Sequence, residues 1–372
     1  MKVLRRFVYR EMLLAVSTVT VAFLGLFFFF DFIDELGAIG RPSPVDTKLV
    51  YELRHALWYV ALQVPNHVYE VLPIAVLIGA VFVFARLAQG SEYTILRTSG
   101  LGPWRALHLL TGLGVGLVAL TLVAGDYAAP AAGKAAQLLK ARFDGRVSMG
   151  PTGAWLKERP QGREVSVNVA ALSGSGELQG VRIFEYDNQG RLAARTQAAL
   201  GNIGGDGHWQ LFQVVRTEFH AQGTQAPQVS TQHLDTLTWP SSLTAEMVSV
   251  ALLRPDRMST LALYGYIEHL QATGQNSQLY ELEFWRKVFY PLSCLVMLVL
   301  ALPFAYLHFR SGSITGYVFG GVMVGISFFL LNNVFGYIGR LNDWLPWAAA
   351  AAPSLIYSVV SLTAFGWLVL RR

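Results

Sequence analysis

Charge and cysteine are both scarce in this sequence. Only 14% of the 372 residues are charged and 53% are hydrophobic, whereas an average soluble domain carries about 25% charged residues. The single cysteine, Cys294, stands inside an apolar run, so it excludes an intrachain disulfide and any metal site built on several cysteines. The shortage of charge, concentrated in long uncharged runs, indicates an integral membrane protein.

Signatures of catalysis are also missing. The sequence has no G-x-x-x-x-G-K-[ST] nucleotide loop, no H-E-x-x-H zinc pair and no G-x-S-x-G nucleophile turn. Its eight histidines are scattered, and the apolar runs hold almost none of the paired acids or histidines that a proton relay needs. We therefore expect no catalytic residue, no bound metal and no cofactor in this chain, and any energy for transport must come from a partner.

Six long apolar runs are present, and each is able to cross a hydrocarbon core of about 30 Å. With the N-terminus inside, every inner segment carries arginine or lysine, as the positive-inside rule requires. Both termini are then cytoplasmic, and the net charge of +5 sets topology rather than binding nucleic acid. The predicted spans cover residues 12–30, 67–85, 106–125, 288–309, 311–339 and 344–370.

Between the third and fourth spans the composition changes. A helix predicted over 128–142 leads out of the membrane, and short alternating runs follow at 164–169, 181–186 and 209–215. Turn residues at 187–190 and 204–207 separate them, which is typical of an antiparallel β-sandwich or jelly roll. Helical periodicity returns over 258–273 and predicts a second helical connector. The predicted domains are 1–125 with three spans, 126–287 with the β-rich insertion outside the cytoplasm, and 288–372 with three spans.

A short capped helix is predicted at about 91–99, on the inner side between the second and third spans. Ser91 is a good N-cap, Glu92 suits the first turn of a helix dipole, and Gly100 is a natural stop. We interpret this segment as the contact through which a cytoplasmic protein acts on the spans. The plainer alternatives are that Glu92 only stabilises its helix and that Arg97 only sets topology.

Glycines and phenylalanines mark the spans. Gly112 and Gly116, four residues apart in an apolar helix, predict close helix packing rather than a nucleotide loop, and Gly316 and Gly320 are interpreted in the same way. The run from Phe27 to Phe30 wraps around its helix, so at most some of its members face one cavity and the rest face lipid.

Three stretches together with the capped helix carry a family resemblance. Residues 72–105, centred on Leu-Ala-Gln-Gly-Ser-Glu-Tyr-Thr-Ile-Leu-Arg-Thr-Ser-Gly at 87–100, resemble the LptF/LptG permeases of the lipopolysaccharide export ABC transporter. The likeness extends over nearly the whole chain. Residues 178–186, 266–275 and 284–292 are more similar to the LptG branch than to the LptF branch.

The resemblance implies a transport subunit of the bacterial inner membrane without enzymatic activity. It pairs with an LptF-type permease, a single-span LptC-type protein and an LptB-type ATPase dimer, which binds ATP and magnesium and grips the coupling helix. Lipopolysaccharide enters a cavity between the two permeases from the outer leaflet and passes through periplasmic β domains to an LptA-type bridge. The residues implied for coupling are Ser91, Glu92, Tyr93, Leu96 and Arg97, and those implied for the substrate cavity are Phe27, Phe30, Arg41, Phe319 and Asn332.

The sequence departs from the family in two places. The outer end of the first span, residues 31–41, has Arg41 as its only basic residue where relatives often carry lysines, so Arg41, Lys48 or the partner permease must meet the lipid phosphates. Asn332 and Asn333 stand where an acidic residue occurs in relatives.

Two other function classes fit part of the pattern. One is a mechanotransmitting ABC subunit for lipoprotein release or efflux, although such subunits usually place the large outer domain between the first and second spans. The other is a non-transporting envelope scaffold, which has no need of a capped cytoplasmic helix. Loss of ATPase association on changing Glu92 separates the transport subunit from the scaffold.

Overall fold

The structure is a computed structural model that describes residues 2–42, 49–90, 102–144, 153–158, 164–173, 177–187, 189–204, 207–220, 228–244, 247–248, 255–306, 314–342 and 344–370. The predicted coupling helix at 91–99 lies outside these residues. The chain divides into two compact units. The first comprises residues 1–34, 60–132 and 278–372, and the second comprises 35–59 and 133–277, so the polar segment between the first two spans joins the β-rich insertion.

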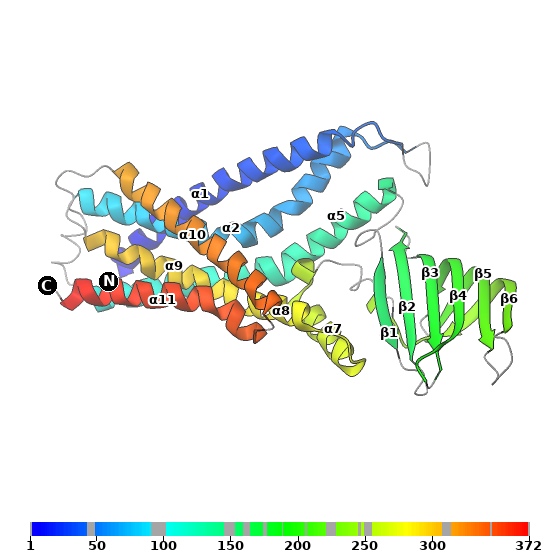
Figure 1. Cartoon of the computed structure of the whole chain (residues 1–372). Coiled ribbons are helices and arrows are strands. Elements are labelled where there is room, and N and C mark those ends of the chain that lie inside the picture. Colours follow the sequence, from blue (N-terminus) through cyan, green and yellow to red (C-terminus); the bar gives the residue numbers. More distant parts are fainter. Residues whose placement is uncertain are drawn as a thin grey trace. The chain divides into compact units, whose positions relative to one another are not determined.

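Among the described residues, six helical segments are long and apolar enough to cross a membrane, which confirms the predicted number of spans. They are α1 (Lys2–Leu36), α2 (Leu53–Gln89), α4 (Pro103–Val123) and, after a broken fourth span, α10 (Ile314–Leu341) and α11 (Pro346–Leu370). The fourth span is assembled from α8 (Gln278–Phe289), a 3-10 turn η4 (Tyr290–Leu292), α9 (Ser293–Ala301) and a second 3-10 turn η5 (Leu302–Tyr306). Figure 1 shows these helices as one bundle.

Proline explains the breaks in the fourth span. Pro291 lies in η4 and Pro303 lies in η5. Proline has no N–H to donate and its ring clashes with the preceding turn, so it disfavours a regular α-helix. The helices α2 and α11 nevertheless continue through Pro65, Pro73 and Pro353. Both turns tighten to the 3-10 form, which keeps the span continuous while α9 remains almost wholly buried.

The second span, α2, is the centre of the membrane unit. Within its most apolar stretch 78% of the residues are buried, against 6% in α1 and 17% in α10. Two neighbouring helices approach it closely at glycines: Gly79 of α2 lies against the backbone of Val16 in α1, and Gly325 of α10 lies against Ile74 of α2. Because a glycine has no Cβ, these contacts bring the helix axes near each other.

One turn of π-helix, η1 (Ala124–Ala128), joins α4 to α5 (Ala129–Asp144). The wider turn falls at Gly125, and a Cβ added there would overlap the ring of Tyr69 on α2. The helix predicted to lead out of the membrane is thus confirmed as α5, and its join to the third span depends on a glycine.

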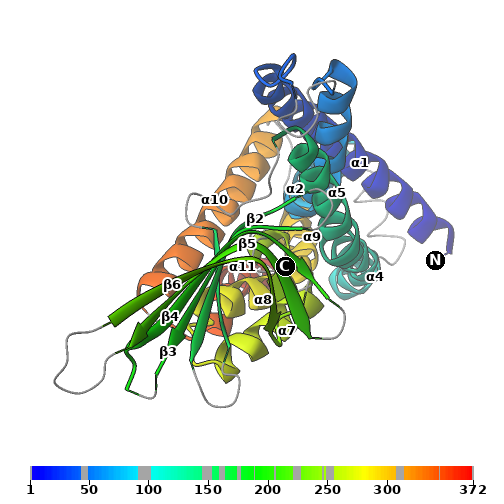
Figure 2. The same ribbon diagram turned by 90° about the vertical axis from the view of Figure 1, so that its right-hand side faces the viewer.

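The second unit holds six antiparallel strands in one sheet, ordered β1 to β6 as in the sequence. The strands lie side by side in Figure 1, and Figure 2 shows that the sheet is curved. The predicted antiparallel β insertion is confirmed, with the connectivity of a meander among the described strands. They are β1 (Ala154–Glu158), β2 (Val165–Leu172), β3 (Leu178–Tyr186), β4 (Leu192–Ile203), β5 (His208–His220) and β6 (Gln228–Pro240).

A row of apolar side chains crosses all six strands. The register aligns the following residues on one face: Ala154, Val169, Val181, Ala198, Val214 and Leu234. The first five of these are buried. Trp209, completely buried at the start of β5, donates its indole N–H to the carbonyl of Leu243 at 3.0 Å. Alternation of apolar and polar residues therefore builds one buried sheet face, as the sequence pattern predicts.

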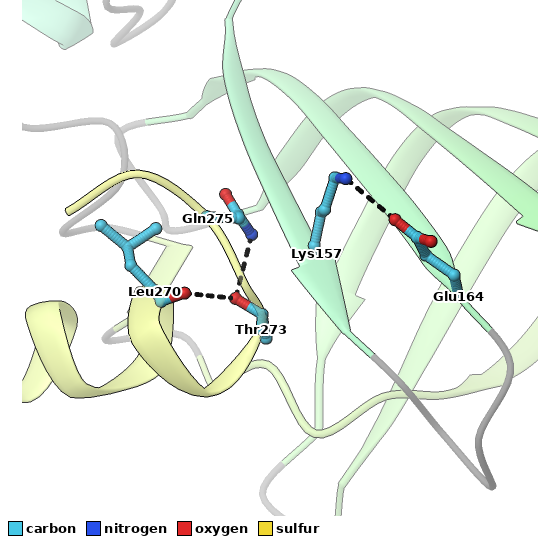
Figure 3. A network of polar contacts seen from close by, with 5 residues as sticks. All are labelled: Lys157, Glu164, Leu270, Thr273 and Gln275. Atoms are coloured by element: carbon cyan, nitrogen blue, oxygen red, sulfur yellow. Dashed lines mark hydrogen bonds and ion pairs between the residues drawn. The ribbon is translucent and has the colours of Figure 1, made fainter.

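The helix α7 (Thr260–Ala272), which confirms the predicted second connector, begins at an N-cap where Ser259 accepts a bond from the N–H of Ala262. It ends in a Schellman motif, because Gly274 has φ +69° and the N–H of Gln275 bonds the carbonyl of Leu270 at 2.8 Å. Figure 3 shows this end of α7, with Thr273 held between Leu270 and Gln275, in the same view as the Lys157–Glu164 ion pair of the sheet.

Near this end of α7, Glu158 is buried, and its Oε2 accepts three bonds from Ser241 and Ser242. His269 of α7 has a pKa below its ordinary value because burial disfavours its charged form, although Glu158 and the Lys157 backbone oppose that shift. The folded state therefore favours neutral His269.

A glycine at the π turn is the first point to test. Gly125→Ala is expected to destabilise the purified protein by about 1–3 kcal/mol, because the new methyl group displaces Tyr69. Gly116→Ala is the matched control, since a Cβ there meets no atom of this chain. Thermal melting in detergent measures both, and equal melting midpoints for the two variants would contradict the packing explanation.

The second prediction concerns pH. A histidine whose pKa is lower in the folded state than in the unfolded state takes up a proton more readily on unfolding, so stability falls as pH drops through about 6.5. We expect the wild type to lose more thermal stability between pH 7.5 and 5.5 than His269→Gln loses. The melting midpoints are measured by tryptophan fluorescence. If the midpoint depends on pH identically in the two proteins, His269 is not the source of the pH dependence.

Candidate functional site

Two of the predicted cavity residues, Phe30 and Phe319, lie on the two most exposed spans, α1 and α10. Phe30 of α1 is 54% exposed and Phe319 of α10 is 64% exposed. They are not brought together, because Phe319 lies near the start of α10 whereas Phe30 lies near the end of α1. Phe319 and Asn332 of α10 are themselves about 20 Å apart along the helix axis. Phe30 and Phe319 thus lie on exposed helix faces, whereas Phe27 and Asn332 are half-buried.

Phe27 has a different environment from Phe30. Its ring stacks on the ring of His67 in α2 with centroids 4.8 Å apart and planes 6° from parallel. It also packs against the buried core of the membrane unit. Of the two phenylalanines, Phe30 is therefore the one available to a molecule outside this chain.

The polar candidates have backbone roles in the structure. The carbonyl of Arg41 accepts the N–H of Tyr51 at 3.0 Å, while the Arg41 residue is exposed. The carbonyl of Asn332 accepts a bond from Arg286 of α8 at 2.9 Å. Their proposed contact with substrate stays a prediction.

The four candidate packing glycines separate into two kinds. A Cβ at Gly112 would meet the hydroxyl of Tyr9, which donates to the carbonyl of Leu109 at 2.8 Å and so ties α1 to α4. Within the described residues, a Cβ added at Gly116, Gly316 or Gly320 would meet no side chain or neighbouring backbone within 4 Å. Their predicted packing role stays a prediction.

A polar belt is formed by residues near the end of α1, in the first half of α2 and in α8. We define it by five residues: Asp31, His67, Glu283, Arg286 and Lys287. The His67 Nε2 lies 2.7 Å from Asp31 Oδ2, and Arg286 bonds both Glu283 and the Asn332 carbonyl. Each of the five belt residues thus has a hydrogen-bond or ion-pair partner on the same or a neighbouring helix, as groups near hydrocarbon require.

Lys287 is the most buried member of the belt, with 8% of its surface exposed. Its Nζ donates to the carbonyl of Gly125 at 2.9 Å and lies 5.8 Å from the ring centre of Tyr69. The lysine therefore binds the π turn of the third span to the fourth span. The sequence does not reveal this contact, although Lys287 directly precedes the predicted fourth span at 288–309 and was a visible signal.

A second polar cluster belongs to the other unit. Glu35 is buried and accepts bonds from Lys140 at 2.5 Å and from the Tyr51 hydroxyl at 3.1 Å. The Lys140 ammonium also lies 4.7 Å from the ring centre of Tyr59. This cluster joins the end of α1, the start of α2 and the end of α5, three segments far apart in the sequence.

These arrangements position helices. Within the described residues no group of three or more His, Cys, Asp or Glu residues is placed to hold a metal ion. The coupling residues Ser91, Glu92, Tyr93, Leu96 and Arg97 lie outside the described residues. The geometry is that of a membrane subunit with two exposed helix faces.

Comparison with known proteins gives consistent matches over the whole length. A family profile described as the lipopolysaccharide export system permease LptF/LptG matches residues 6–370. The chain is 28% identical over 344 residues to the lipopolysaccharide export system permease protein LptG of Escherichia coli K12, covering 92% of this chain and 90% of that protein. It is 27% identical over 372 residues to LptG of Haemophilus influenzae, covering 99% and 98%.

Lys287→Met tests the belt. The variant keeps the apolar stem but leaves the Gly125 carbonyl without its donor, so we expect a loss of about 1–3 kcal/mol of stability. Lys134→Met, at an exposed position, is the matched control and is expected to leave the melting midpoint nearly unchanged. A Lys287→Met protein that melts with the control would show that the lysine does not hold the π turn.

Proposed function

Because this chain belongs to the LptF/LptG family of lipopolysaccharide export permeases, we propose that it is the LptG-type subunit of an ABC transporter. In this proposal it extracts lipopolysaccharide from the outer leaflet of the inner membrane and passes it to a periplasmic bridge. ATP hydrolysis in an LptB-type partner drives the step. The match over residues 6–370 is the observation that carries the proposal.

The exposed spans support a second permease as partner. Only 6% of the apolar stretch of α1 and 17% of that of α10 are buried within this chain. Gly116, Gly316 and Gly320 add open small-residue positions, which favour close helix contact in a membrane. An LptF-type permease facing α1 and α10 encloses Phe30, Phe319 and the other candidate residues in a shared cavity.

Two features of the sequence support a separate ATPase as the energy source. The sequence has no nucleotide loop, and its helix at about 91–99 lies on the side rich in arginine. We assign Glu92, Tyr93 and Leu96 to the contact with the ATPase and Arg97 to the same helix. ATP and magnesium then belong to the partner, and this chain is non-catalytic.

The family match over the whole length favours export over the two rival functions. A mechanotransmitting subunit usually places its outer domain between the first two spans, whereas here the β insertion follows the third. With the N-terminus inside, that insertion is periplasmic and both termini are cytoplasmic. An LptC-type protein and an LptA-type bridge complete the route.

Co-purification tests the proposal. We expect the wild-type chain to assemble with an LptB-type ATPase and an LptF-type permease and to show hydrolysis stimulated by lipopolysaccharide. Glu92→Lys is expected to lose assembly or coupled hydrolysis, because it reverses a charge in the coupling helix. Glu177→Lys, an exposed charge reversal in the β unit, is the matched control.

The outcomes separate the candidate functions. If wild type recruits no ATPase, the transport proposal fails. If the complex with Glu92→Lys assembles and hydrolyses ATP like the complex with Glu177→Lys, the helix at 91–99 is not the contact that couples the ATPase to this chain. Hydrolysis stimulated by a lipoprotein instead of lipopolysaccharide assigns the chain to the mechanotransmitting class.

A further inference from the structure

The first half of α1 carries a groove of about 750 Å³. It is lined by the following seven residues of α1, which we call the α1 groove: Arg5, Arg6, Tyr9, Arg10, Leu13, Leu14 and Ser17. Their spacing of one and four places them along one face of the helix, because side chains four apart lie one above the other. The groove is therefore a continuous strip about 18 Å long.

The chemistry of the α1 groove changes along its length. Arg5, Arg6 and Arg10 are exposed at its N-terminal end. Leu13 and Leu14 follow, 44% and 54% exposed. A membrane lipid has the same order of chemistry, with a charged phosphate at the surface and acyl chains below it.

The positive charge of the groove is not neutralised within the described residues. The seven lining residues include no carboxylate. Glu11, the acid nearest to them on α1, is paired with Arg86 of α2. Guanidinium groups bind phosphate oxygens through two parallel N–H bonds, so the N-terminal end of the groove suits an anionic phosphate.

We propose that the α1 groove binds an anionic glycerophospholipid, with its phosphate between Arg6 and Arg10 and an acyl chain along Leu13 and Leu14. A partner helix is a poorer occupant, because an apolar helix packed on three arginines leaves buried charges without counter-ions. A zwitterionic lipid is also poorer, since the described residues that line the groove offer no acid to its ammonium group. The proposal requires only that α1 spans the membrane and does not depend on the transported substrate.

Lipid titration followed by native mass spectrometry tests the site. The full-length protein is purified in a neutral detergent and titrated with phosphatidylglycerol or phosphatidylcholine. Two lost arginine contacts, each worth about 1 kcal/mol at a membrane surface, predict roughly 30-fold weaker phosphatidylglycerol binding in the Arg6→Gln/Arg10→Gln double variant. Phosphatidylcholine binding is expected to stay unchanged.

The control is Arg371→Gln/Arg372→Gln, which removes the same charge from the other end of the sequence. It is expected to bind phosphatidylglycerol like wild type. Equal weakening in the two double variants would reduce the effect to net charge and overturn the site. Wild-type affinity in Arg6→Gln/Arg10→Gln overturns it as well.

Two further arms identify the occupant. Glycerophosphoglycerol, the headgroup without acyl chains, is expected not to compete with the lipid; full competition shows a phosphate site and contradicts the proposal. A photo-crosslinking amino acid at Leu14 is expected to yield a phospholipid adduct in membranes. A protein adduct in its place shows that a partner helix covers the groove, which also overturns the proposal.

Discussion

The burial of α2 is the constraint on which the membrane unit depends. Its neighbours approach it closely, since a Cβ on Gly79 would overlap the backbone of Val16 and one on Gly325 would press on the side chain of Ile74. In a membrane no hydrophobic effect drives one helix against another, so packing at small residues supplies much of the attraction. The positions of α1 and α10 follow from their contacts with α2, and their other faces are left for other molecules.

Polar groups are confined to places where the backbone needs them. The broken fourth span ends its helical segments at Pro291 and Pro303, and the third span widens into a π turn at Gly125. Lys287 donates to the carbonyl at that turn, and the Tyr290 hydroxyl donates to the carbonyl of Glu70 at 2.5 Å. An irregular backbone near hydrocarbon is stable when side chains of neighbouring helices satisfy its hydrogen bonds. Lys287 of the belt and Tyr290 therefore stabilise these irregular segments by bonding backbone carbonyls.

Hydrophobic runs and turn residues predicted the six spans, the antiparallel insertion and three of its strands. The strands β1, β4 and β6 were missed, because Ala-rich and Thr-rich segments such as 192–203 and 228–240 give a weak alternating signal. Contacts between residues far apart in the sequence, such as Asp31 with His67 or Lys287 with Gly125, could not be predicted from hydrophobic periodicity, because they depend on how the helices pack. The glycines of α10 show the same limit. Gly320 is open whereas Gly321 touches Val81, because one residue turns a helix by about 100°.

The meander of the β unit bears on how the chain is made. Each strand from β2 to β6 pairs with the strand that was synthesised just before it. The loops that must close are short, so little entropy is lost at each step, and sheets with local pairing fold faster than those that join distant strands. The sheet is able to grow strand by strand as the segment emerges, before the last three spans have been synthesised. The unpaired edge of the growing sheet is then always the newest strand. Each such edge is exposed only until the next strand pairs with it, which limits the time available for aggregation.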